Sequence, residues 1–161
     1  MNQERLELIK SKLASLYVEF SDVNGTPAVV TDEKSVLEIC GILKTDADIS
    51  FEMLLDVLGV DNFKKEKRFE VVCSLYSIKF RDRIFVKITL NDSKNPEMPS
   101  LTALWKSADW YERETFDMFG INFTGHPDMR RIYMPEEFEH YPLRKDFPLL
   151  GIPDSIYLPK K

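Results

Sequence analysis

The placement of proline sets the strongest limit on how this chain can fold. Six of the nine prolines in the 161 residues lie in the last 35, at positions 127, 135, 142, 148, 153 and 159. Proline lacks a backbone N–H and fixes φ, so this segment cannot form long helices or central strands. It also lacks the spaced apolar residues needed for a core of its own. The sequence therefore predicts an α/β domain over residues 1–125 and an extended C-terminal arm over residues 126–161, which is not an independent domain.

The C-terminal arm is nevertheless rich in aromatic side chains, which a disordered linker would lack. Its charges balance, with six basic against six acidic residues. An arm stiffened by proline loses little entropy when it is ordered, and aromatic residues and arginine are enriched in protein interfaces. We therefore expect the arm to lie across the surface of another protein. Its aromatic residues are Tyr133, Phe138, Tyr141, Phe147 and Tyr157.

Apolar residues at helical spacing predict three helices before the arm. The first spans residues 4–20, with an inward face of Leu6, Ile9, Leu13, Leu16 and Phe20. The second is capped by Thr31 or Asp32, and its inward residues are Val36, Leu37, Cys40 and Leu43. The third is capped by Ser100 and carries Leu101, Leu104, Trp105, Ala108, Phe116 and Phe119 on a common face. Gly120 and Gly125 are expected to end this helix and to shape the turn that follows.

Alternating apolar residues predict the strands. A short strand covers residues 28–30, and a longer one covers 49–60 with Phe51, Met53, Leu55 and Val57 alternating. An antiparallel hairpin with a turn at 81–83 joins two further runs, Phe69, Val71, Cys73 and Leu75, then Ile84, Val86 and Ile88. Residues 91–100 are predicted to be a loop. This order predicts an α/β (α+β) two-layer sandwich, in which helices cover a mostly antiparallel sheet.

Composition and charge exclude several classes of function. The net charge of −5 and the lack of a basic stripe argue against nucleic acid, and the short KKEKR run at 64–68 is typical of a solvated loop or strand edge. No signal peptide and no apolar run of about 20 residues is present, so we expect a soluble, cytoplasmic chain that reaches a membrane only through a partner. Cys40 and Cys73 lie among apolar residues, which predicts buried reduced thiols. Two cysteines are too few for an ordinary iron–sulfur cluster.

Two groups of residues could in principle carry chemistry. His126 and His140, with Asp128 or Glu139 as a third ligand, could hold a metal ion, but their 14-residue separation matches no standard zinc pattern. His126 precedes proline, so its imidazole is expected to bond a backbone or carboxylate group instead. No glycine-rich phosphate loop and no GxSxG elbow is present. We therefore expect no catalytic, cofactor-binding or metal-binding residue in this chain.

A cluster of acids on the third helix is the second group. Asp109, Glu112, Glu114 and Asp117 could supply a general acid–base pair. The simpler interpretation is structural, with Arg113 and Asp117 forming an (i, i+4) ion pair. Arg130 and Arg131 are then expected to pair with carboxylates of residues 112–117 or of a partner protein.

The stretch from 109 to 151 resembles a known family. Its first block reads Glu112-Arg113-Glu114, Asp117-Met118-Phe119-Gly120-Ile121, Gly125-His126-Pro127-Asp128 and Arg130-Arg131-Ile132. Its second block runs from Pro142 to Leu149 and ends with Gly151. Both blocks resemble the 30-kDa subunit family of NADH-quinone oxidoreductase, which is the C-type subunit of bacterial respiratory complex I. One departure is His140-Tyr141, where many members carry Gly-His, so no role is carried over to His140.

The resemblance implies a non-catalytic assembly subunit in the hydrophilic arm of proton-translocating NADH-quinone oxidoreductase. It implies a peripheral position on the cytoplasmic side of the cell membrane, against the large subunit that helps form the quinone cavity. Flavin, iron–sulfur clusters, NADH and quinone would all be bound by partner subunits. The residues expected to form the interface are Glu112, Arg113, Glu114, Asp117, His126, Asp128, Arg130, Arg131, Arg144, Lys145, Asp146 and Phe147.

Two alternatives stay open on the sequence. The same module serves membrane-bound nickel–iron hydrogenases and ferredoxin-dependent photosynthetic-type complexes that are related to complex I. A different class would be a free-standing metal-dependent enzyme that uses His126, Asp128 and His140.

Overall fold

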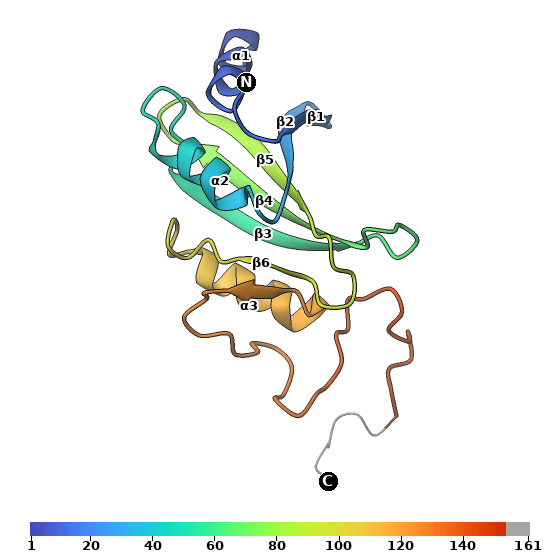
Figure 1. Ribbon diagram of the computed structural model, residues 1–161. Coiled ribbons are helices and arrows are strands. Elements are labelled where there is room, and N and C mark those ends of the chain that lie inside the picture. The colour runs from blue at the N-terminus through green and yellow to red at the C-terminus, as the bar shows by residue number, and fades with distance from the viewer. Residues whose placement is uncertain (154–161) are drawn as a thin grey trace.

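A computed structural model of the chain describes residues 1–153 (Figure 1). The end of the C-terminal arm, including Tyr157, lies outside these described residues. The elements in chain order are α1 (Gln3–Lys12), β1 (Glu19–Val23), β2 (Thr26–Asp32), α2 (Val36–Thr45), β3 (Met53–Asp61), β4 (Phe69–Ser77), β5 (Asp82–Thr89), β6 (Glu97–Pro99), α3 (Ala108–Phe119) and β7 (Asn122–Thr124).

Five strands form the main sheet in the order β1-β2-β5-β4-β3. Only the β2–β5 pair is parallel, and the other pairs are antiparallel. The predicted hairpin is present, with Cys73 of β4 opposite Val86 of β5. Helix α2 lies over one face of the sheet, while α3 and β6 lie beside β3 (Figure 1). The predicted α/β architecture with a mostly antiparallel sheet is confirmed.

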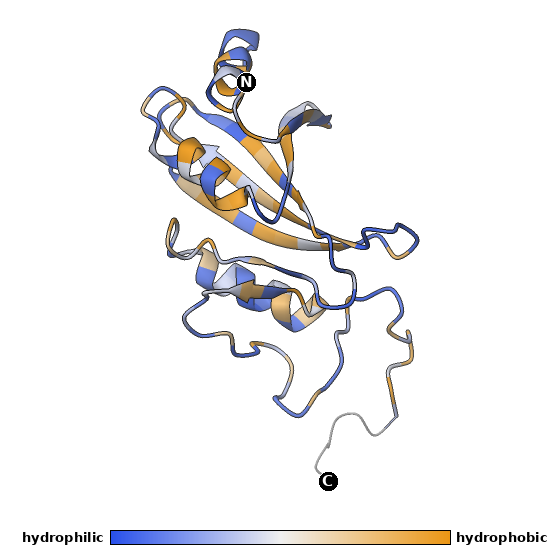
Figure 2. Ribbon diagram, viewed as in Figure 1, coloured by the Kyte–Doolittle hydropathy of each residue, from blue (hydrophilic) through white to orange (hydrophobic). Residues whose placement is uncertain are grey.

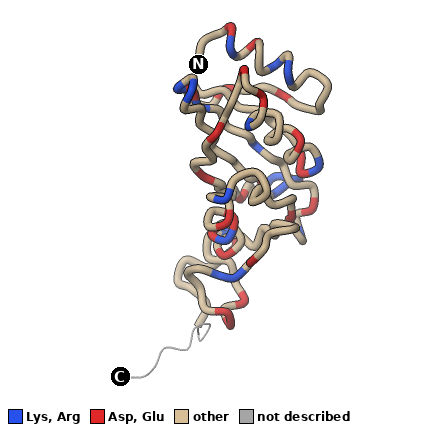
Figure 3. The backbone as a smooth tube through the Cα atoms, turned by 90° about the vertical axis from the view of Figure 1, so that its left-hand side faces the viewer, with Lys and Arg blue, Asp and Glu red and all other residues tan. Residues whose placement is uncertain are grey.

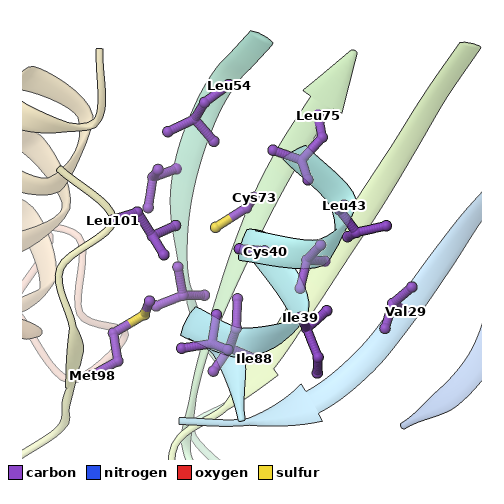
Figure 4. Close-up of a cluster of buried hydrophobic side chains, with 14 of the residues drawn as sticks. Val29, Ile39, Cys40, Leu43, Leu54, Cys73, Leu75, Ile88, Met98 and Leu101 are labelled. Atoms are coloured by element: carbon purple, nitrogen blue, oxygen red, sulfur yellow. The ribbon is translucent and has the colours of Figure 1, made fainter. Parts of the chain in front are cut away.

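The hydrophobic core lies between α2 and the sheet and continues toward β6. The apolar positions gather in the strands and in α2 (Figure 2). Cys40 of α2 and Cys73 of β4 both point into this layer, and Met98 and Leu101 extend it on the far side of β3 (Figure 4). Both cysteines are fully buried free thiols, as predicted, and burial raises the pKa of Cys40 to about 12. These thiols therefore stay protonated and act as small apolar side chains.

The first helix is shorter than predicted. It ends at Lys12, and Phe20 lies in β1 rather than on a helix face. The cause is the Asn24-Gly25 turn, whose φ angles of 51° and 82° suit a tight hairpin. This turn pairs β1 with β2 and so draws residues 19–23 into a strand.

Two inward faces also differ from the prediction. Thr31 and Asp32 belong to β2 and do not cap α2, which starts after Ser35. On α2, Leu37, expected to face inward, is 39% exposed, and Ile39 is buried in its place. In β3 the register shifts between Leu54 and Asp56, which is a bulge. A bulge inserts one residue into one strand and so breaks the alternation of faces. Met53, expected inside, is therefore 41% exposed, and Leu54 is buried.

The third helix begins later than predicted. Ser107, not Ser100, precedes α3, and residues 102–104 and 106–107 form turns. Within the predicted loop, β6 pairs in parallel with β7. The segment leading into α3 and α3 itself also cover the edge of the sheet. Three side-chain donors there bond backbone carbonyls of residues 52–57: Trp105 Nε1 to Glu52 (3.0 Å), Ser107 Oγ to Leu54 (3.2 Å) and Thr115 Oγ1 to Val57 (2.6 Å). This cover protects the β3 edge from pairing with another strand.

Candidate partner-binding site

The C-terminal arm is fastened to the domain at Asp117, a buried carboxylate of α3. Asp117 Oδ2 accepts the backbone N–H groups of Ile132 (3.0 Å), Tyr133 (2.7 Å) and Met134 (3.0 Å). Arg131 Nη1 donates to Asp117 Oδ1 at 2.8 Å. Burial alone would raise the pKa of Asp117, but these four donors outweigh it and lower the pKa. The charged carboxylate therefore fixes the turn at 131–134 against α3.

A second fastening joins the arm to the sheet. Asp61, at the end of β3, accepts two bonds from Arg68 (2.8 and 2.7 Å) and the backbone N–H of Lys145 (2.8 Å). Arg68 also donates to both oxygens of Asp146, at 3.0 and 2.8 Å. Burial opposes ionisation of Asp61, yet these donors lower its pKa. One guanidinium thus bridges β3 and the arm with paired hydrogen bonds on each side.

The arm also packs on the end of α3. Gly120 adopts φ 68°, and Arg144 Nε donates to the carbonyl of Phe119 at 2.6 Å. The Arg144 guanidinium lies 4.6 Å from the centre of the Tyr141 ring. A Cβ atom at Gly120 would lie 2.5 Å from Tyr141 and 2.6 Å from Arg144. Glycine is therefore required here by both backbone angle and space, and the expected helix ends at Gly120 as predicted.

His126 is held inside the molecule by two contacts. Its Nε2 lies 3.2 Å from the carbonyl oxygen of Asp109, and its Nδ1 accepts the backbone N–H of Asp128 at 3.0 Å. The proton is thus assigned to Nε2, because Nδ1 acts as the acceptor. Both ring nitrogens are occupied, which confirms the expected backbone partner. Over residues 1–153, no three His, Cys, Asp or Glu side chains are placed to hold a metal ion.

Glu112 is a buried carboxyl that fixes the turn before α3. Its side chain is 0% exposed and accepts bonds from Ser100 Oγ (2.6 Å) and from the backbone N–H of Leu101 (2.6 Å). Burial raises its pKa to about 7, although both hydrogen bonds favour the charged form. Ser100, expected to cap the helix, instead bonds this carboxyl from a position twelve residues earlier.

The arginine pairs differ in part from the prediction. The predicted ion pair between Arg113 and Asp117 is wrong, because the Asp117 carboxylate faces the arm. Arg113 Nη1 instead lies 3.9 Å from the carboxylate of Asp109. Arg131 pairs with Asp117, as expected. Arg130 pairs instead with Asp128 on the surface, at 2.6 Å.

The twelve predicted interface residues fall into three groups. The side chains of Glu112, Asp117 and His126 are 0% exposed, so they can support an interface only by holding other segments in place. Partly exposed are Arg113, Asp128, Arg131, Arg144 and Phe147. Exposed are Glu114, Arg130, Lys145 and Asp146. Their role at an interface stays a prediction.

The arm has an inner and an outer side. Phe138 is 3% exposed and packs edge-on against His140 and Phe147, with ring centres 5.5 and 6.2 Å apart. The arm thus buries more apolar surface than its sequence indicated. Its outer side shows Leu149 and Leu150, which are fully exposed. Two exposed leucines in succession are a candidate contact point for another protein.

Sequence reasoning misses Asp61 and Arg68. The charge pattern places Arg68 in a solvated run, but its side chain is 15% exposed and forms the second fastening. Asp61 and Lys145 are 84 residues apart in the chain, and no local pattern links them. The one available signal is the position of Arg68 directly before the apolar strand run at Phe69.

Comparison with known proteins places the chain in a family. Residues 29–152 match the family described as respiratory-chain NADH dehydrogenase, 30 Kd subunit. The chain is 41% identical over 148 residues to a C-type subunit of NADH-quinone oxidoreductase from Rhizobium etli, covering 92% of this chain and 78% of that protein. It is 43% identical over 148 residues to the corresponding C-type subunit of a Roseiflexus species, covering 92% and 84%. The chain belongs to the 30-kDa subunit family of respiratory-chain NADH dehydrogenase.

Solved structures agree with this membership. The trypsin-resistant fragment of Nqo5 is similar with a TM-score of 0.68 and 31% identity, over 77% of this chain and 98% of that one. A chain of the membrane-bound sulfane sulfur reductase, an archaeal respiratory membrane complex, is similar with a TM-score of 0.76 and 25% identity, over 92% and 88%. None of the helices within residues 1–153 combines the length and the apolar character that a membrane-spanning helix requires.

Proposed function

We propose that this chain is a non-catalytic assembly subunit in the hydrophilic arm of a proton-translocating NADH-quinone oxidoreductase. The proposal rests on the bonds made by the first sequence block that resembles the family. The charged residues of this block, above all Asp117 and Arg131, bond within the chain and hold the C-terminal arm in one shape. A preformed arm with exposed leucines suits docking, because little ordering entropy remains to be lost on binding.

We also propose that the cofactors of the complex lie in partner subunits. The chain has two cysteines, and both are buried with raised thiol pKa values. An ordinary iron–sulfur cluster is held by four cysteine thiolates. Flavin, NADH and quinone are likewise assigned to partners.

The partner proposed for the arm is the large subunit that helps form the quinone cavity. We accordingly propose that the chain lies at the periphery of the membrane, on the cytoplasmic side. The support is the apolar outer side of the arm, with Tyr133, Leu143, Leu149 and Leu150 exposed by 55% or more. Aromatic and apolar residues of this kind form the centre of protein interfaces.

The hydrogenase-type and ferredoxin-type complexes are the less favoured alternative. The similarity to the sulfane sulfur reductase chain shows that this fold also occurs in another respiratory complex. Relatives named as C-type subunits of NADH-quinone oxidoreductase, at 36–44% identity, favour the leading proposal.

Purification of the tagged chain from native membranes in mild detergent tests the proposal. We expect flavin and iron–sulfur subunits to co-purify, together with NADH-quinone reductase activity. Hydrogenase subunits in their place would favour the alternative. A chain that purifies alone would contradict both, and stoichiometric metal that is lost in His126→Ala would instead support a metal-dependent enzyme.

A further inference from the structure

The loop between β3 and β4 forms a basic hollow together with the arm. A cavity of about 290 Å³ at this place is lined by Asn62, Phe63, Lys64, Lys65 and Lys145. Three of these five residues are lysines and none is an acid. The chain as a whole carries a net charge of −5, and its charges of both signs are interspersed along the backbone (Figure 3). A hollow bordered by three lysines and no acid is therefore a local departure from the rest of the molecule.

The ion pairs near the hollow do not involve all of its lysines. Arg68, next to the hollow, is neutralised by Asp61 and Asp146. Lys65 lies 3.5 Å from Glu70 and is 63% exposed. Lys64 and Lys145 have no carboxylate within 4 Å among the described residues. Two of the three lysines that border the hollow thus have no carboxylate partner among the described residues.

A buried polar atom lies at the same place. Asn62 Nδ2 is shielded from solvent and has no hydrogen-bond partner within the described part of the chain. A buried N–H group without an acceptor is destabilising, so an acceptor that reached Asn62 would be favoured. Phe63, 50% exposed, adds an apolar surface beside it.

The loop that carries the hollow is ordered by its own bonds. The Asn62 N–H donates to the carbonyl of Arg68 (2.7 Å), and Ser93 Oγ donates to the carbonyl of Glu66 (2.9 Å). The Arg68 guanidinium lies 4.8 Å from the centre of the Phe63 ring and supports it. The hollow is therefore preformed rather than created by a ligand.

We propose that this hollow is a second docking point, which receives an acidic segment of a neighbouring protein subunit. A carboxylate there pairs with Lys64 and Lys145, and the apolar stem of the segment packs on Phe63. Charge complementarity selects this occupant, because Lys64 and Lys145, which lack a carboxylate partner among the described residues, favour an anionic acceptor. The inference rests on the proposed function, since the neighbouring subunit belongs to the same complex.

Zero-length cross-linking of the purified complex with a water-soluble carbodiimide tests the proposal. The reagent joins an amine to a carboxylate only where the two are in contact. We expect Lys64 or Lys145 to couple to an Asp or Glu of another subunit, while exposed Lys106, near the start of α3, does not. Lys65 is left out of the comparison, because Glu70 of its own chain competes for it.

A charge-reversal pair gives an independent measurement. The K64E/K145E variant is compared with R83E/K106E, which makes the same charge change at exposed positions near the opposite end of β3. We expect K64E/K145E to lower the fraction of chain retained in the complex after a salt wash by roughly threefold or more relative to the control. Equal melting temperatures of the two variants show that folding is not the cause.

The outcomes separate this inference from the proposed function. An intact oxidoreductase without couplings at Lys64 and Lys145, and with equal retention of the variants, overturns the docking point alone. Couplings only to the acids of proteins outside an oxidoreductase contradict both the proposed occupant of the hollow and the proposed function. A chain that purifies alone and couples to nothing overturns both.

Discussion

Arg130 and Arg131 are adjacent in the sequence but have different surroundings. Arg130 pairs with Asp128 in solvent, with 69% of its side chain exposed. Arg131 pairs with fully buried Asp117 and is 11% exposed. Exposed pairs contribute about 0–1 kcal/mol, whereas breaking a buried pair costs about 3–5 kcal/mol. The contribution of each arginine is thus set by its position rather than by the motif that both belong to.

Substitution of these arginines should therefore give unequal effects. Arg131→Ala is expected to lower the free energy of unfolding by about 3 kcal/mol, at the low end of the range because Asp117 keeps three backbone N–H bonds. Arg130→Ala is the matched control and should change it by less than about 0.5 kcal/mol. Urea unfolding of the two purified variants measures both values. Equal losses would show that the buried Arg131–Asp117 pair contributes no more to stability than the exposed Arg130–Asp128 pair.

Glu112 predicts a dependence of stability on pH. Its pKa of about 7 in the folded chain lies above the usual value of 4.5, so the folded chain binds more protons between these values. This contribution is fully present below pH 4.5 and is lost as the pH rises through 7. Glu112→Gln keeps an oxygen acceptor for the Leu101 N–H and removes the titration. Urea unfolding at several pH values should show a flatter profile for the variant, and parallel profiles would contradict the assignment.

At the scale of elements, the junction of α3 with the arm depends on Gly120. A side chain at position 120 would be strained by the backbone φ of 68° and would clash with atoms of Tyr141 and Arg144. At Gly125, with φ 82°, an added Cβ would have no atom within 4 Å, so a side chain there would suffer backbone strain but no clash. Gly120→Ala should thus lower the melting temperature more than Gly125→Ala, and trypsin should cleave its arm sooner. Identical behaviour of the two variants would mean that the arm does not pack on α3 as described.

The elements also show which parts of the fold are predictable from sequence. Strands β4 and β5 alternate regularly and match the prediction, because burial on one face leaves a period of two. Two local features make the neighbouring elements differ from the prediction. The bulge in β3 changes which residues face inward, and the hairpin turn at Asn24-Gly25 pairs residues 19–23 with β2. The sequence shows the arm's resemblance to a family, but it does not show that the arm is bonded to Asp61. That contact depends on β3 and β4 being paired first.

At the scale of the whole molecule, the arm divides at about residue 147. The fastening bonds to Asp117, Asp61 and Phe119 all involve arm residues up to Asp146, whereas Leu149 and Leu150 are bare. Truncation after Leu149 should therefore leave the melting transition unchanged and weaken assembly into the complex. Thermal denaturation and co-purification measure the two effects. Loss of the melting transition would place the missing tail in the core of the domain.

On the proposed function, the chain presents a preformed arm to its partner. Hydrogen exchange, followed for the isolated chain and for the purified complex, distinguishes a preformed arm from one that is ordered by binding. We expect the amides of residues 132–134 to be protected in both states, because Asp117 holds them. The amides of Leu149 and Leu150 should become protected only in the complex. Rapid exchange at 132–134 in the isolated chain, or exposed leucine amides in the assembled complex, would contradict the claim.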